Sequence, residues 1–254
     1  MLIYILLVLS GLATGFINSV AGGGGIVLYP ILQILGLPLL ITNATITAAS
    51  SFGSLSSVYG YKKYLKKLPK RYFLVLIPCL IGAVIGSTLL LHTSNNKLKL
   101  IIPALILIAV ILTGLQPEIH RIFFKRKAQS RKYNPLYLII FSSTILLTAI
   151  YGGYFGAGFG IIILAILGLS SMRNIQTLNG LKNLSSAVIT LSATTVFSFH
   201  HLIDWHYAEP LIIGTILGGY IGSKISAKLP TKYIRLTVVV IGVIVAIYLL
   251  IKPV

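Results

Sequence analysis

The sequence predicts an all-α membrane protein, a polytopic helix bundle. Of its 254 residues 56% are hydrophobic and only 9% are charged, whereas a soluble domain carries about a quarter charged residues. The mean hydropathy is +0.96. Only 3 acidic residues stand against 21 Lys and Arg, a formal charge of +18. The apolar content excludes a disordered chain and disfavours a nucleic-acid binder despite the positive charge.

A membrane-spanning helix needs about 20 mostly apolar residues. Six mostly apolar stretches of this kind occur, at residues 2–19, 72–91, 98–115, 135–150, 207–222 and 234–251. No basic region precedes the first, so we interpret it as a retained helix and not as a signal peptide. Two further stretches, 41–61 and 177–199, are long enough but rich in Ser, Thr and Asn.

Two short apolar pieces, 26–37 and 159–169, each follow a glycine cluster. They are short for full spans, and broken or re-entrant helices are the usual alternative. The sequence therefore predicts 8–10 membrane segments, either as five crossings in each half or as eight crossings with two re-entrant pieces.

The chain divides into two homologous halves: a first membrane repeat (1–115), a basic cytoplasmic linker (116–135) and a second membrane repeat (136–254). An ungapped alignment of the chain with itself, at a single offset, places identical residues on one another. The matches are Gly22 on Gly158, Gly24 on Gly160, Asn43 on Asn179, Gly82 on Gly218, Ile85 on Ile221, Gly86 on Gly222 and Ser87 on Ser223. Glycine and asparagine matches at one offset indicate an internal repeat.

Charge bias predicts that the two halves are inverted. Segment 62–71 carries six Lys or Arg and should be cytoplasmic, whereas its counterpart, 198–207, carries none. Conversely, segment 224–235 is basic, and its counterpart in the first half carries fewer basic residues. Opposite bias at equivalent loops is what inverted repeats produce.

Lys182 is the most informative residue. It lies inside the polar stretch 177–199, and a lysine near the bilayer centre costs at least about 2.5–3.5 kcal/mol unless it is paired. The only carboxylates are Glu118, Asp204 and Glu209, all in or near expected loops. We expect Lys182 to neutralise a transported anion; the alternative is a lysine that snorkels to the interface.

Amide and hydroxyl side chains lie next to this lysine in the sequence and also in the equivalent stretch of the first half. Asn179 and Asn183 flank Lys182, and Asn43, Thr45 and Thr47 lie in the first half. Asn and Thr can bind an oxyanion without adding charge. The alternative is that they join helices to one another in lipid.

Two glycine clusters, AGGGG at 21–25 and GGYFGAGFG at 152–160, lead into the short apolar pieces. Unwound glycine backbone and a helix N-terminus together favour an anion. The expected substrate-binding glycines are Gly22, Gly23, Gly24, Gly25, Gly156, Gly158 and Gly160. Close helix packing is the alternative, and it is the expected role of Gly82, Gly86, Gly214, Gly218 and Gly222.

No enzyme, metal or cofactor pattern stands out. The group HHLIDWH, with His200, His201, Asp204 and His206, fits an extracytoplasmic loop with an interfacial Trp205 better than a metal site. Paired carboxylates, HExxH and a Ser–His–acid arrangement are missing from the apolar stretches, and the single Cys79 excludes a Cys-based zinc site.

Four strings, GFINSVAGGGGIVLYPIL, TNATITAAS, YGGYFGAGFGIIILAILGL and NGLKNLSSA, resemble the TauE/SafE family, the sulfite exporter family. The resemblance covers nearly the whole chain. It implies a multi-pass transporter of the bacterial inner membrane that moves sulfite, a sulfonate or a related organosulfur anion. It bears on Asn18, Gly22 to Gly25, Pro30 and Asn43, and on Gly152, Gly153, Gly156, Gly158, Gly160, Asn179, Lys182 and Asn183.

We therefore expect a secondary transporter, an exporter of a small anion that works by alternating access, with Lys182, Asn18, Asn43, Thr47, Asn179, Asn183 and the glycines as its binding residues. Its partners would be the anion and the lipid bilayer. Proton coupling, the identity of the anion and the oligomeric state stay open. The alternative is a membrane assembly or scaffold protein whose Gly and Asn motifs only pack helices.

Overall fold

The structure, a computed structural model, describes residues 1–125, 135–169, 174–226, 236, 238–244 and 246–247. Every regular element in these ranges is a helix, which confirms the all-α class. In chain order the elements are α1 (Leu2–Val20), the 3-10 helix η1 (Gly24–Val27), α2 (Leu28–Ile34), α3 (Leu39–Leu65), the 3-10 helix η2 (Lys70–Val75), α4 (Leu76–Leu91), α5 (Asn95–Lys125), α6 (Pro135–Tyr154), α7 (Phe159–Gly168), α8 (Ile175–Phe199) and α9 (Trp205–Ile225). The described residues between 236 and 247 are also helical.

Three helices of the described chain are both long and apolar enough to cross a membrane: Leu2–Val20, Lys70–Leu91 and Asn96–Leu115. Shorter apolar helices cover Gly24–Ile34, Leu138–Tyr154 and Phe159–Gly168. The polar helices α3 and α8 contain 27 and 25 residues, more than the roughly 20 that a bilayer requires. Their Ser, Thr and Asn side chains are mostly buried, so other helices shield them from lipid.

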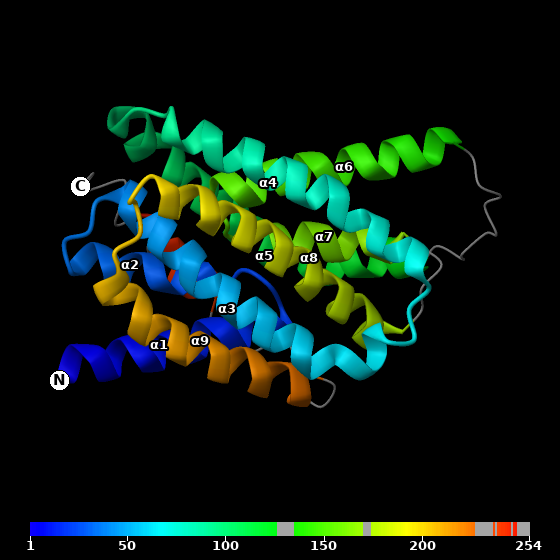
Figure 1. Ribbon diagram of the computed structural model, residues 1–254, viewed down its shortest axis with the longest axis horizontal. Coiled ribbons are helices and arrows are strands. Elements are labelled where there is room, and N and C mark those ends of the chain that lie inside the picture. The colour runs from blue at the N-terminus through cyan, green and yellow to red at the C-terminus, as the bar shows by residue number, and fades with distance from the viewer. Residues whose placement is uncertain (126–134, 170–173, 227–235, 237, 245, 248–254) are drawn as a thin grey trace.

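The polar helices form the centre of the bundle (Figure 1), where α3 packs against α8. On one side α1 packs along α9, and on the other α4 packs along α6. Glycines permit these contacts. A Cβ at Gly15 would overlap the backbone oxygen of Thr215 in α9, and one at Gly86 would overlap that of Ile150 in α6. A Cβ at Gly82, Gly214, Gly218 or Gly222 would also lie within 3 Å of a backbone oxygen of a neighbouring helix, which confirms the expected role of these glycines in packing.

The two halves present the same order of elements. A long helix (α1 or α6) ends at glycines, a short helix (α2 or α7) follows, and a polar helix (α3 or α8) comes next. In Figure 1, α1 starts at the left end and α6 at the right, and α3 and α8 run in opposite directions.

The basic and histidine-rich connections lie at opposite ends of the bundle. The end of α3 and the start of η2, which contain the basic segment 62–71, lie at the right in Figure 1, and the α8–α9 connection lies at the left. Helix α5 continues to Lys125, into the expected linker, because the string EIHRIFFK (118–125) contains no glycine or proline to end it. Residues 126–134 of that linker lie outside the described residues.

Candidate functional site

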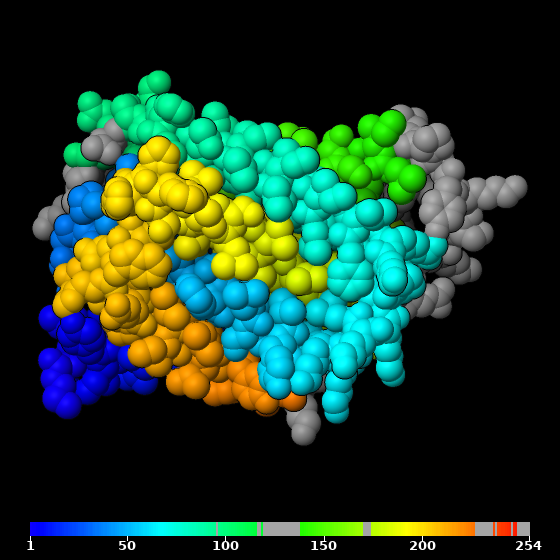
Figure 2. Space-filling view, in the orientation of Figure 1, coloured from blue at the N-terminus to red at the C-terminus, as the bar shows by residue number. Residues whose placement is uncertain are grey.

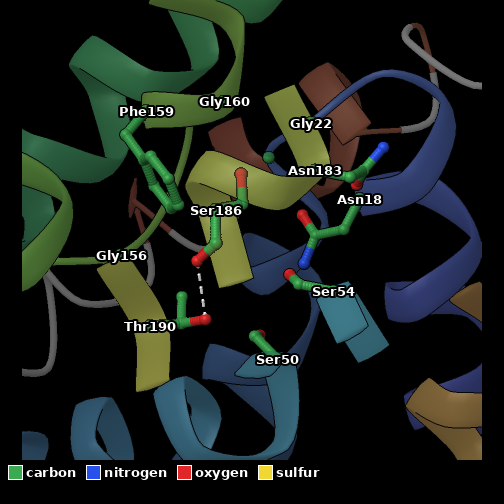
Figure 3. Close-up of a pocket in the computed structure, with 11 residues that line it drawn as sticks. Asn18, Gly22, Ser50, Ser54, Gly156, Phe159, Gly160, Asn183, Ser186 and Thr190 are labelled. Carbon is green, nitrogen blue, oxygen red and sulfur yellow. Dashed lines mark hydrogen bonds between the residues drawn. The ribbon is translucent and has the colours of Figure 1, made fainter. Parts of the chain in front are cut away.

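A small cavity lies between α3 and α8, next to both glycine breaks (Figure 3). It is lined by Asn18, Gly22, Gly23, Ser50, Ser54, Gly156, Phe159, Gly160, Asn183, Ser186 and Thr190. The volume of the cavity is about 20 Å³. Since one water needs about 10–15 Å³ on this measure, the cavity is closed tightly around a water-sized volume.

Hydroxyl groups from both polar helices face the cavity. Ser50 and Ser54 come from the middle of α3, and Ser186 and Thr190 from the middle of α8. Residues four apart share one face of a helix, so each pair points to the same side. The Thr190 hydroxyl donates to the backbone oxygen of Ser186 at 2.8 Å. Within the part of the chain that the structure describes, the hydroxyls of Ser50, Ser54 and Ser186 have no hydrogen-bond partner, although all three residues are buried.

Asn18 adds an oriented amide to these hydroxyls. Its Oδ1 accepts a 2.7 Å hydrogen bond from the backbone N–H of Gly24, so the amide NH2 must point the other way. Figure 3 shows this nitrogen directed toward Ser54. Asn183 also lines the cavity, but its Nδ2 donates to the backbone oxygens of Ser19 (3.1 Å) and Asn179 (2.9 Å).

The glycine breaks bring backbone to the cavity in a conformation that other residues rarely adopt. Gly22, Gly23, Gly156 and Gly158 have φ values of 82°, 86°, 77° and 77°, in the left-handed region that favours glycine. Gly158 is the N-cap residue that directly precedes α7. The first N–H groups of a helix lack carbonyl partners inside it and carry a partial positive charge.

The N-terminus of α7 therefore opens on the cavity, since its first two residues, Phe159 and Gly160, line the wall. Across the cavity, Gly23 at the start of η1 also lines the wall. The Gly22 N–H is already engaged, because it donates to the backbone oxygen of Ile17 at 3.0 Å.

Lys182 lies beside the cavity but is not part of its lining. Its side chain is 1% exposed, so it does not snorkel to the interface. The Nζ donates to the backbone oxygens of Asn18 (2.8 Å) and Ser19 (3.1 Å), at the end of α1. These carbonyls carry the partial negative charge of a helix C-terminus. An ammonium has three donors, so one remains beyond these two bonds.

Asn43, which the self-alignment places on Asn179, also lies outside the lining. Its Nδ2 donates to the backbone oxygen of Tyr154, where α6 ends, at 2.9 Å. Its Oδ1 accepts a 2.5 Å hydrogen bond from the Tyr29 hydroxyl, and Thr47 donates to its backbone oxygen at 2.8 Å. Each polar helix thus caps the broken helix of the opposite half.

The structure brings together only part of the expected binding set. Asn18, Gly22, Gly23, Gly156, Gly160 and Asn183 line the cavity. Lys182, Asn43, Thr47, Asn179, Gly24, Gly25 and Gly158 do not. The buried Asn179 Oδ1 has no hydrogen-bond partner among the described residues.

Sequence reasoning missed Ser50, Ser54, Phe159, Ser186 and Thr190. The sequence does contain a pattern that could have identified the four hydroxyl residues. The self-alignment that places Gly22 on Gly158 also places Ser50 on Ser186 and Ser54 on Thr190.

The chemistry of the lining favours an anion. Hydrogen-bond donors come from the hydroxyls of the lining serines, from the Asn18 amide and from the start of α7. The buried Lys182 lies behind the wall, and the lining contains no carboxylate. In the described ranges, no three His, Cys, Asp or Glu side chains come close enough to hold a metal. His206 instead contacts the Tyr4 hydroxyl, at 3.0 Å from Nδ1.

Comparison with known proteins finds relatives that match nearly the whole chain. A relative from Sinorhizobium sp, named "Probable membrane transporter protein ORF9", is 28% identical over 94% of this chain and 89% of its own. "Probable membrane transporter protein YfcA" of Escherichia coli K12 is 24% identical over 93% and 85%. "Probable membrane transporter protein YdhB" of Bacillus subtilis 168 is 24% identical over 92% and 94%. No solved structure gives a significant match. The family model for the sulfite exporter TauE/SafE matches residues 7–249, and the chain therefore belongs to the TauE/SafE family.

Proposed function

We propose that this protein is a secondary transporter of the bacterial inner membrane that exports a small anion, sulfite, a sulfonate or a related organosulfur anion. The single observation that carries the proposal is a cavity without carboxylates in its lining, onto which the hydroxyl-bearing residues Ser50, Ser54 and Ser186 open from both polar helices. Hydroxyl groups on the wall of a closed cavity can donate hydrogen bonds to the oxygen atoms of a bound oxyanion. The family and the names of the relatives support a membrane transporter.

The proposed binding mode uses neutral donors close to the solute and one cation behind them. The hydroxyls and the Asn18 amide bind the anion's oxygen atoms, and the start of α7 adds backbone donors and a partial positive charge. The Lys182 side chain lies near this wall, since a Cβ at Gly160 would lie 3.8 Å from the Lys182 Cδ. Lys182 thereby offsets the charge of the anion and also caps α1.

The proposed mechanism is alternating access between two inverted repeats. Equivalent positions of the two halves contribute Ser50 with Ser186 and Ser54 with Thr190. A four-atom oxyanion is larger than the water-sized volume of the cavity, so α3 and α8 must separate to admit it. Separation toward one end and then the other carries the solute across, a motion typical of repeats that enclose a site at mid-depth.

A proteoliposome flux assay tests the function. The purified protein is reconstituted, and the flux of sulfite, sulfate, thiosulfate and small sulfonates is measured with and without a pH gradient. We expect saturable flux of sulfite or a sulfonate above that of empty liposomes, and the pH arm decides whether protons are coupled.

The alternative, an assembly or scaffold protein, is favoured by one observation: Lys182 and Asn43 hold helices together through backbone carbonyls. A scaffold would give folded protein with no flux for any of these anions. That result would overturn the transport proposal.

A further inference from the structure

A second cavity, separate from the one between α3 and α8, lies at the basic end of the bundle. It is an open groove of about 400 Å³ lined by Leu55, Val58, Tyr59, Lys62, Leu65, Lys66 and Phe73. These residues belong to the last part of α3 and to η2, the light blue and cyan surface at the lower right of Figure 2. The walls are apolar apart from the two lysines and the Tyr59 hydroxyl, and the volume is in the range of small-molecule sites, about 300–1,000 Å³.

The two lysines place positive charge along this apolar groove. Lys62 Nζ lies 3.9 Å from the centre of the Tyr59 ring, a cation–π contact that holds the ammonium beside the groove. Lys66, the residue directly after α3, lies one turn further on and is also exposed. Leu55 and Tyr59 are 41% and 58% exposed, so the groove opens on the surrounding medium.

The protein itself supplies little negative charge to this region. Residues 1–117 contain no Asp or Glu. Asp204 and Glu209 lie where α9 begins, at the opposite end of the bundle in Figure 1. Glu118, in α5, is not among the residues that line the groove.

We propose that this groove binds an anionic phospholipid of the cytoplasmic leaflet, with an acyl chain against Leu55, Val58 and Phe73 and the phosphate between Lys62 and Lys66. The basic segment 62–71 places the groove at the cytoplasmic interface, and basic pockets beside membrane helices on that side bind anionic headgroups. Charge argues against a second copy as the occupant, because the same chain carries a formal charge of +18 and offers only three acids.

The chain offers a matched control for the charge. Lys63 and Lys67 have the same spacing in the same basic segment, but they do not line the groove. The test compares the double variant Lys62→Gln/Lys66→Gln with Lys63→Gln/Lys67→Gln. Cys79 is the one cysteine and is fully buried, so its reaction with a thiol-specific dye reports thermal unfolding.

Each protein is unfolded in detergent with added phosphatidylglycerol, phosphatidylcholine or inorganic phosphate. We expect phosphatidylglycerol to raise the unfolding midpoint of the unaltered protein more than phosphatidylcholine does, because a ligand stabilises the state it binds. The Lys62/Lys66 variant should lose at least half of that difference, and the Lys63/Lys67 variant should keep it. Equal losses in both variants, or an equal effect of inorganic phosphate, would overturn the proposal.

A second pair of variants tests the apolar part without changing charge. Leu55→Trp fills the groove and should reduce the number of phosphatidylglycerol molecules retained in native mass spectrometry. Leu80→Trp, at a 51% exposed position on α4, should leave that number unchanged. Retention unaffected by Leu55→Trp, or loss of a dimer with Leu55→Trp alone, would contradict a lipid in this groove, and the second result would assign it to another copy.

Discussion

The Nζ of Lys182 lies 2.8 Å from the backbone oxygen of Asn18, so a lysine of the second half caps the last turn of the first helix. Asn43 makes the equivalent bond to Tyr154 from the first half, at 2.9 Å. In the self-alignment of the two halves, Asn18 and Tyr154 are equivalent positions. The carbonyls at both breaks are therefore capped by a side chain of the opposite half: α1 by the Lys182 ammonium, and α6 by the neutral Asn43 amide.

Lys182 has two roles that substitution can separate. Lys182→Gln keeps a donor for the carbonyls of α1 and removes the charge, whereas Lys182→Met removes both. We expect both variants to reduce anion flux at least about tenfold, the factor produced by about 1.4 kcal/mol, and only Lys182→Met to lower the unfolding midpoint markedly. Flux in proteoliposomes and Cys79 labelling measure the two effects. Undiminished flux in Lys182→Gln would show that the charge is not needed.

The serine pair provides a test of equivalence between the halves. Ser50→Ala and Ser186→Ala should each raise the KM for the anion by about tenfold or more, since a hydrogen bond to a charged group contributes about 1.5–3 kcal/mol. Neither should change stability much, because neither hydroxyl has a partner in the described structure. Ser87→Ala is the control: its hydroxyl donates to the Ala83 backbone oxygen at 2.8 Å in α4, so the KM should not move. An effect from only one of the pair would argue against equal use of the two halves.

Substitution of Gly160 tests the volume of the cavity without disturbing helix packing. A Cβ there would meet its nearest atoms at 3.6–3.9 Å, and alanine is about 1 kcal/mol better than glycine inside a helix. We expect Gly160→Ala to fold normally and to lose flux, because the methyl group occupies a cavity of about 20 Å³. In Gly86→Ala the Cβ would overlap the Ile150 backbone oxygen, so the unfolding midpoint should fall. Normal flux in Gly160→Ala would place the solute elsewhere.

Asn43 and Asn179 are sequence equivalents with different surroundings. Asn43→Leu leaves the buried Tyr29 hydroxyl and the Tyr154 oxygen without their partner, which should cost about 1–3 kcal/mol of stability. Asn179→Leu removes an amide oxygen that already lacks a partner among the described residues, so its cost should be much smaller. Denaturation curves of both variants measure the difference, and a larger loss for Asn179→Leu would contradict the hydrogen bonds described above.

The sequence by itself determined the class of the protein, the helical segments and the positions of the breaks. Hydrophobic length identifies a membrane helix without knowledge of its neighbours, and glycine clusters mark backbone that only glycine adopts, as the positive φ values of Gly22 and Gly158 demonstrate. For Lys182 the sequence left two positions open, shielded inside the bundle or snorkelling to the interface, and the 1% exposure of the side chain decides for the first.

Only the tertiary structure decided which polar side chains share the cavity and which cap a helix. Lys182 and Asn43 cap helices, whereas Ser50 and Ser186, which sequence reasoning passed over, face the cavity. The physical reason is that a side chain's partners depend on the angle at which α3 and α8 pack and on the place where α1 and α6 end. Those contacts join residues that lie far apart in the chain, and local patterns carry no information about them.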